Sequence, residues 1–243
     1  AVHASTVSGG EWIYKGEAGD RRTFAGATGD SDLTEVRVTS DEANVHFLVR
    51  MSGIGNTSLP AVGIALDTDQ NTGANAGMKW IGDSSTPSGS ILLGNAVQNA
   101  ERQIMLYANG AGQPVIRIFH GGQWREPGPD ARIAIDGDAG LVEASIPRGD
   151  LGISYPQRIT MTLATFGSSG NDVGSDATYN SPNNDNDAID VMGGDIGVTA
   201  GAWARDLSDG RIDRYQQFVL GHDGAKAVQV GGIWNFPSDG YID

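Results

Sequence analysis

The chain has 243 residues, of which 30 are acidic and 16 are Lys or Arg, so its formal net charge at pH 7 is −14. This charge disfavours nucleic acid as a partner, because the phosphates would be repelled. The absence of cysteine excludes disulfides, thiolate metal sites and a cysteine nucleophile, and no apolar run is long enough to predict a membrane span.

Residues that form turns are abundant along the whole chain. Glycine contributes 36 residues, which is about twice the usual share. The acidic residues comprise 23 Asp and 7 Glu, and Asp is the one favoured in turns and in cation sites built from oxygen ligands. Clusters of Gly, Asp and Asn separate runs rich in β-branched residues, which predicts many strands joined by turns.

Strand-like runs recur from the first third of the chain to its last quarter, whereas helical periodicity is weak. We predict strands at 34–38, 45–51, 61–66, 103–107, 114–119, 132–135, 141–146, 158–166, 188–192 and 213–220. Three pairs read as hairpins: the first two strands, the fourth with the fifth, and the sixth with the seventh. Along the second strand, Val45, Phe47, Val49 and Met51 share one face, which we expect to lie on the core.

No linker and no shift in composition divides the chain, so we predict a single domain over residues 1–243. Short, evenly spaced strands favour an all-β fold, an antiparallel β-sandwich of jelly-roll-like type. Residues 1–10 and 226–243 are expected to be terminal extensions or added strands of this sandwich. Residues 167–187 form a long polar stretch without a pattern, which predicts a functional or ion-ordered loop.

A candidate cation loop follows the strand at 61–66. Its sequence places oxygen-bearing side chains at every second position, in Asp67, Asp69 and Asn71, before a backbone carbonyl near Gly73. Oxygen ligands of this kind suit Ca²⁺. The spacing is not that of an EF-hand, because Met78 stands where the bidentate Glu would be. We interpret the loop as a calcium site, and a polar turn without an ion is the alternative.

Further acidic residues extend this prediction. Asp83 is a candidate additional ligand if the chain loops back toward the first site. Asp185, Asp187 and Asp190 lie within six residues, where their charges would repel one another unless a cation or solvent separated them. A second calcium site and a solvated loop both remain open for this cluster.

Two tryptophans in polar, glycine-rich surroundings are candidates for ligand binding. Trp80 and Trp124 are the ones flanked by such sequence, in contrast to Trp203, which we expect in the core. An indole face can stack on the apolar C–H face of a sugar ring, while carboxylates and amides bind its hydroxyls. The alternative for each is an ordinary core or rim position.

Three segments, in this order, resemble a known group of modules. They are the hairpin 32–38 with 45–51, the strand that ends in Asp67-Thr68-Asp69, and the run 142–152. Together they resemble the DOMON-like and family 9 carbohydrate-binding-module β-sandwiches, and they are similar to the glucodextranase C-terminal type of module. The resemblance spans most of residues 11–220. It implies a β-sandwich that binds saccharide and holds structural calcium.

From these observations we expect a non-catalytic carbohydrate-binding module, stabilised by calcium and acting on a polysaccharide or oligosaccharide. We expect it to be extracellular or on the surface of a prokaryotic cell, and a chain that begins at Ala1 fits a processed secreted protein, an excised domain or a trimmed chain. One alternative is a structural subunit of a surface layer or filament that self-associates through edge strands. The other is a polysaccharide-acting enzyme domain, although no zinc motif and no nucleophile elbow is present.

Overall fold

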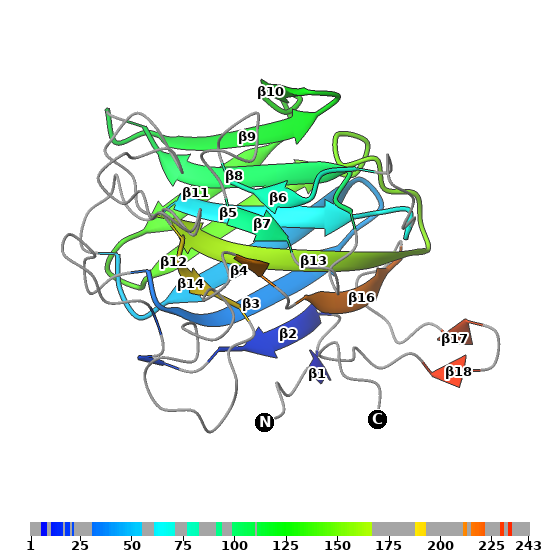
Figure 1. The fold of residues 1–243 in the computed structure, drawn as a ribbon, viewed down its shortest axis with the longest axis horizontal. Coiled ribbons are helices and arrows are strands. Elements are labelled where there is room, and N and C mark those ends of the chain that lie inside the picture. Colours follow the sequence, from blue (N-terminus) through cyan, green and yellow to red (C-terminus); the bar gives the residue numbers. More distant parts are fainter. Residues whose placement is uncertain are drawn as a thin grey trace.

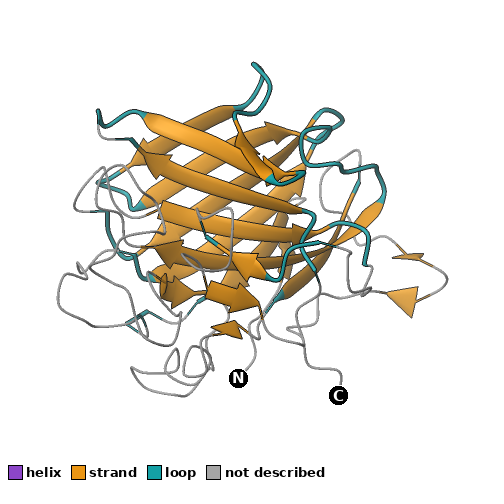
Figure 2. Ribbon diagram, turned by 45° about the horizontal axis from the view of Figure 1, so that its top comes forward, coloured by secondary structure: helices purple, strands orange, loops and turns teal. Residues whose placement is uncertain are grey.

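The computed structural model describes residues 6–8, 11–16, 18–19, 21, 31–54, 61–70, 77–82, 91–93, 99–109, 111–166, 188–192, 211–212, 215–221, 229–230 and 233–234. Within these ranges there is no helix, and the strands form two large antiparallel sheets packed face to face (Figures 1 and 2). The predicted all-β sandwich is therefore confirmed.

One sheet has six strands in the order β1-β2-β3-β4-β12-β11. Its strands are β1 (Thr6–Ser8), β2 (Glu11–Lys15), β3 (Leu33–Ser40), β4 (Asn44–Met51), β12 (Leu141–Pro147) and β11 (Arg132–Asp136). The hairpins predicted at 34–51 and 132–146 are confirmed as β3–β4 and β11–β12. They join into one sheet because β12 pairs with β4, with Ala144 opposite Phe47. Strand β2 was not predicted.

The second sheet has seven strands in the order β10-β9-β8-β5-β13-β14, and β16 also pairs with β13. These strands are β5 (Ala61–Asp67), β8 (Arg102–Ala108), β9 (Pro114–His120), β10 (Gln123–Arg125), β13 (Gln157–Phe166), β14 (Ala188–Val191) and β16 (Gln216–Leu220). The predicted hairpin of 103–107 with 114–119 is confirmed as β8–β9. The longest predicted strand, at 158–166, is confirmed as β13.

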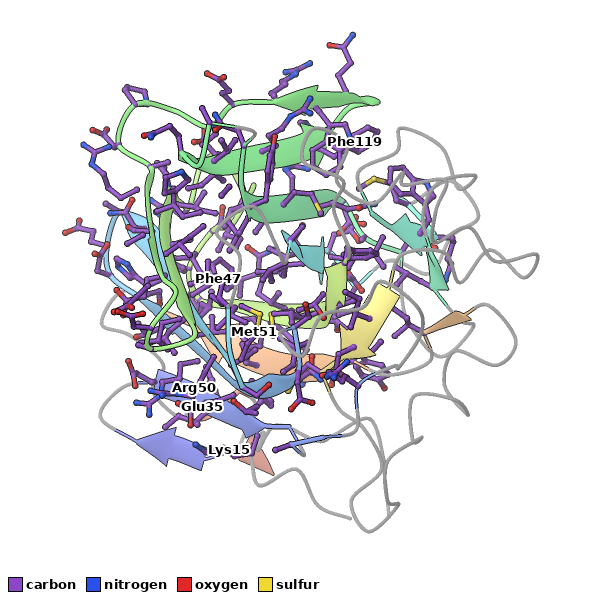
Figure 3. All side chains as sticks on the ribbon, turned by 90° about the vertical axis from the view of Figure 1, so that its left-hand side faces the viewer. Lys15, Glu35, Phe47, Arg50, Met51 and Phe119 are labelled. Carbon is purple, nitrogen blue, oxygen red and sulfur yellow. The ribbon has the colours of Figure 1, made fainter. Side chains whose placement is uncertain are left out.

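The main core lies between the two sheets. As predicted, Val45, Phe47, Val49 and Met51 of β4 face it and are at most 3 % exposed. Figure 3 shows Phe47 and Met51 inside the sandwich and Arg50, on the opposite face of the same strand, outside it. The period-two alternation of the sequence thus becomes the inside and the outside of the first sheet.

The two sheets are also joined by hydrogen bonds along one side. Trp12 on β2 donates its indole N–H to the Val219 carbonyl of β16, at 2.8 Å. From the same strand, the Tyr14 hydroxyl donates to the Gln217 carbonyl at 2.9 Å. Both aromatic rings are buried, and their polar ends find a backbone partner there, as buried Trp and Tyr require.

A small third layer covers the outer face of the seven-stranded sheet. It contains β6 (Trp80–Ile81), β7 (Ile91–Leu93) and β15 (Arg211–Ile212), with β7 and β15 parallel. Ile81, Leu93 and Ile212 of this layer pack with Phe166 and Met105 of the sheet in a second apolar cluster. All seven residues of β5 are buried as a result, because both faces of that strand are covered.

One side chain of the sheet holds the outer layer in place. Gln103 on β8 is fully buried, and its amide donates to the Trp80 carbonyl at 2.6 Å. The amide oxygen accepts the Gly82 N–H at 3.1 Å. The side chain therefore satisfies the backbone groups on both sides of Ile81, as a neighbouring strand would do.

Replacing this amide is expected to loosen the third layer. Gln103→Met keeps the length of the side chain but leaves a buried carbonyl and a buried N–H without partners, which costs about 1–3 kcal/mol of unfolding free energy. Urea unfolding measures this difference. The control is Gln113→Met at an exposed position of the β8–β9 turn, expected within about 0.5 kcal/mol of the unmodified protein. Equal stability of the two variants would contradict the assigned role of Gln103.

The predicted loop and the predicted terminal segments fall wholly or largely outside the described ranges. The loop 167–187 lies outside them entirely, and no structure is assigned to it. At the N-terminus, β1 adds an edge strand to the six-stranded sheet. Near the C-terminus, β17 (Gln229–Val230) and β18 (Ile233–Trp234) pair with each other, and Figure 1 places them to the side of the sandwich.

Candidate cation site

Three carboxylates meet at one end of the seven-stranded sheet. Asp67, Asp69 and Glu101 each place one oxygen within 4.8 Å of the others. Asp67 is the last residue of β5, and Glu101 directly precedes β8. Because β5 and β8 are antiparallel neighbours, the end of one lies beside the start of the other, and the Glu101 N–H donates to the Leu66 carbonyl at 2.9 Å. Sheet pairing therefore brings Glu101 to the loop.

One oxygen of Asp67 shapes the loop itself. Its Oδ1 accepts the N–H of Asp69 at 3.2 Å and that of Gln70 at 2.7 Å, which closes an Asx turn. Gln70 takes a left-handed backbone conformation, with φ of 57°. The Gln70 side chain is held by Thr160 of β13, whose hydroxyl donates to its amide oxygen at 3.2 Å. The direction of the Asp67 carboxylate is thus set by the backbone that follows it.

Two oxygens of the cluster are buried without a hydrogen bond among the described residues. Asp67 is 2 % exposed, and neither its Oδ2 nor Glu101 Oε1 has a partner among the described residues. The second Glu101 oxygen, Oε2, accepts the Thr68 N–H at 2.6 Å. A buried carboxylate oxygen without a donor is costly, because a group that bound water in the unfolded chain has lost it. A cation bound to these two atoms would compensate for the hydrogen bonds that they lack.

A glycine leaves room beside these oxygens. A Cβ built on Gly77 would lie 2.8 Å from Glu101 Oε1 and 2.6 Å from the Ala100 carbonyl oxygen, so a side chain at this position would collide with the cluster. Gly77 also has a φ of 150°, which L-amino acids rarely adopt. Only glycine allows the backbone at position 77 to pass this close to the carboxylates.

The cluster is electrostatically strained without an ion. Burial raises the pKa of Asp67 to about 7; the hydrogen bond from the Gln70 N–H opposes this rise, and the charges of Glu101 and Asp69 add to it. Burial also raises the pKa of Glu101, with a further contribution from the charge of Asp69. A bound divalent cation would reverse this balance and keep the carboxylates ionised.

The donor set indicates the kind of cation. All three side chains offer carboxylate oxygens, and no His belongs to the cluster among the described residues. Oxygen ligands suit Ca²⁺, Mg²⁺ and Mn²⁺ and disfavour Zn²⁺ or copper. Of these, Ca²⁺ accepts irregular sets of six to eight oxygens, which fits a loop supplemented by carbonyls or water.

The structure brings together some of the predicted ligands. Asp67 and Asp69 lie together with Glu101, and we call these three residues the acidic triad. Five further predicted ligands lie outside the described ranges: Asn71, Gly73, Asp83, Asp185 and Asp187. Glu101 was missed by the sequence interpretation. The available signal was its position just before a predicted strand, which becomes informative only once that strand is paired with 61–66.

Asp190, the last predicted ligand, lies elsewhere in the fold. It is buried on β14, where Oδ2 accepts the Leu33 N–H at 2.6 Å and Oδ1 accepts the Val191 N–H at 2.8 Å. The carboxylate thereby links the second sheet to the start of β3. A cation shared with Asp185 and Asp187 stays a prediction.

The two predicted sugar-stacking tryptophans belong to one row of aromatic rings. Trp80 is 7 % exposed, and its ring meets Phe119 edge to face at 5.2 Å between centroids. Phe119, labelled in Figure 3, meets Trp124 in the same way at 5.3 Å. Arg117 lies over the Trp124 ring at 5.6 Å. Little of Trp80 is open to a ligand, whereas Trp124 is partly exposed; stacking of sugar on either stays a prediction.

Calcium is expected to raise the melting temperature of the metal-free protein. At a free concentration of about 100 times Kd, an ion that binds only the folded state contributes about 2.7 kcal/mol. For a chain of this size, that amounts to roughly 5–11 °C. Scanning calorimetry in EDTA and in excess Ca²⁺ measures the shift.

The control for this experiment separates the triad from other acidic groups. Glu101→Gln is expected to lose most of the shift, and Asp138→Asn, at an exposed turn, is expected to keep it. An identical melting temperature in EDTA and in calcium would contradict the cation site and leave the loop as a polar turn.

Comparisons with known proteins leave the chain without an assigned family. No protein-family model matches the sequence, and no curated protein matches it. Within the described ranges, no helix has the length and apolar character needed to cross a membrane. The resemblance to DOMON-like and family 9 modules therefore stays a prediction.

Proposed function

We propose that this protein is a non-catalytic carbohydrate-binding β-sandwich, secreted or displayed on a cell surface, whose loop edge is stabilised by one Ca²⁺ ion at the acidic triad. The observation that supports the ion is a pair of buried oxygens, Asp67 Oδ2 and Glu101 Oε1, that have no hydrogen-bond partner among the described residues; carbohydrate binding rests on the β-sandwich fold and on the resemblance stated above. The ion would tie the end of β5 to the start of β8, and its binding energy would add to folding stability.

The triad supports a structural role better than a catalytic one. A carboxyl whose pKa is raised to about 7 is also what a general acid in glycoside hydrolysis needs. Such an acid must reach the glycosidic oxygen of a bound substrate, however, and Asp67 is only 2 % exposed. A compact ion can enter a site of this kind, whereas a polysaccharide cannot.

Isothermal titration against a panel of α- and β-glucans, xylan and mannan tests this function, with a parallel assay for released reducing ends. We expect binding to at least one glycan without release of sugar, by a protein that remains monomeric in light scattering. Absence of binding to every glycan would overturn the carbohydrate-binding function. Release of sugar would favour the enzyme, and ordered polymers under the electron microscope would favour the surface-layer subunit.

A further inference from the structure

The outer face of the six-stranded sheet carries a groove of about 340 Å³. It runs across β3, β4, β12 and β11, on the side that no other described strand covers. Its size lies at the lower end of the roughly 300–1,000 Å³ typical of small-ligand sites. The groove is separate from the acidic triad and from Trp80 and Trp124, all of which belong to the other sheet or to strands beside it.

Strand register arranges the groove in two parallel rows. The first row contains polar side chains, in the order Thr39, His46, Ser145 and Arg132. The second contains an apolar pair on either side of a carboxylate, in the order Arg37, Leu48, Glu143 and Ala134. Leu48 and Ala134 therefore form a floor, and donors and acceptors stand along it.

The charged groups of the groove are balanced. Arg37 is paired with Glu11, at 3.1 Å, and with Glu35. Arg132 donates to the backbone carbonyls of Pro129 and Ala131, which holds its guanidinium at the end of the first row. The lining residues thus include two arginines and two carboxylates, those of Glu11 and Glu143. A groove without net charge gives no advantage to a charged ligand.

Glu143 is the carboxylate of this groove that is available to a ligand. It is exposed, and no ion pair or hydrogen bond joins its side chain to another described residue. It stands between Leu48 and Ala134 in the second row. A carboxylate beside an apolar floor matches a sugar ring, which offers C–H groups on its face and hydroxyl donors at its edge.

We propose that this groove is the saccharide-binding surface and that it takes a short stretch of a neutral glycan. The ring face lies on Leu48 and Ala134, Glu143 accepts from ring hydroxyls, and the hydroxyls of Thr39 and Ser145 complete the contacts. The proposal rests on the carbohydrate-binding function above and names its site. Because the acidic triad belongs to the other sheet, glycan affinity well below the melting temperature is independent of calcium.

Two groove variants and two controls test the proposal, with a neutral glycan bound by the unmodified protein as the probe. Glu143→Gln removes the charged acceptor, and Ala134→Gln covers the floor from an exposed position of an edge strand. Glu143→Gln is expected to weaken binding at least about tenfold, the loss typical of a hydrogen bond to a charged group. Ala134→Gln is expected to weaken binding by a similar factor, because its longer side chain occupies the place of the sugar ring. Arg50→Gln, on the same face of β4 but outside the groove, and Gln113→Met, at the exposed β8–β9 turn of the other sheet, are expected to bind within about twofold of the unmodified protein.

The possible outcomes distinguish failure of the proposed groove site from failure of the carbohydrate-binding function. If both groove variants melt and bind like the unmodified protein, the groove is not the site while the carbohydrate-binding function stands. If the unmodified protein binds no glycan at all, both proposals fail; if it binds only a charged glycan, the groove proposal fails and the carbohydrate-binding function stands. Should Glu143→Gln lower the melting temperature, Ala134→Gln decides the question.

Discussion

In the absence of divalent cations, the unfolding free energy contributed by Asp67 is expected to fall as the pH rises from about 4 to about 7. The folded protein holds this carboxyl at a pKa of about 7, against 3.8 for the ordinary group. Between these values the folded state binds more protons than the unfolded state does, so raising the pH favours unfolding. Below the lower value the carboxyl is protonated in both states and the penalty of the buried charge is absent; above the upper value the full penalty remains.

The size of the effect follows from the two pKa values. A rise from 3.8 to about 7 corresponds to roughly 4 kcal/mol between the protonated and ionised forms, as an upper figure. Glu101, whose pKa is raised by burial, acts in the same direction. Exposed carboxylates with lowered pKa, such as Asp41, act in the opposite direction. The dependence of the unfolding free energy on pH is therefore compared between the unmodified protein and a variant rather than interpreted alone.

Urea unfolding in EDTA at several pH values provides the measurement, with Asp67→Asn as the matched variant. The amide keeps the Oδ1 acceptor for the turn and removes the buried charge, so the metal-free variant is expected to equal or exceed the unmodified protein at neutral pH. Adding Ca²⁺ is expected to reverse that order. Parallel pH curves for the two proteins in EDTA would refute a buried, ionisable Asp67.

Phe166→Ala is expected to lower the unfolding free energy by about 3–5 kcal/mol, the range for truncating a large buried aromatic side chain. Phe166 is 1 % exposed and faces the third layer rather than the main core. Its ring lies directly on the backbone of Gly63, where an added Cβ would come within 2.6 Å of Cε2. The loss of unfolding free energy in Phe166→Ala therefore measures how much the packing of β6, β7 and β15 on the sheet contributes to stability.

Leu163→Ala is the companion variant for this measurement, because Leu163 lies on the same strand but faces the main core. We expect about 2–5 kcal/mol for this truncation, so the two variants should be comparable in chemical denaturation. If Phe166→Ala cost less than about 1 kcal/mol while Leu163→Ala remained severe, the third layer would contribute nothing to stability.

The strands could be predicted well because their signals are local. Alternation in 34–51 gave both the hairpin and its core face, and the cluster Asp136-Gly137-Asp138 marked the turn between β11 and β12. Short strands with few apolar residues were harder: β10 has three residues and no alternation that the sequence alone would reveal. Pattern reasoning needs several residues of one period before it is informative.

Burial on both faces of β5 shows where local pattern is insufficient. The run Ala61–Leu66 predicted a strand, and its small residues at alternate positions were compatible with close packing. Whether a second layer would cover that face depended on residues 80–81, 91–93 and 211–212, which lie outside that run. Such contacts are set by the free energy of burying apolar surface between distant segments, which no local pattern encodes.

By itself, the sequence determined that this chain forms β-strands, which residues of β4 face inward, and that Asp67 and Asp69 stand together at the end of a strand. Only the tertiary structure decided that Glu101 completes the triad, that Trp80 is covered, and that Glu143 faces an open groove. The physical reason is that side-chain direction follows from local backbone geometry, whereas a site forms where sheet pairing brings separate strands into register.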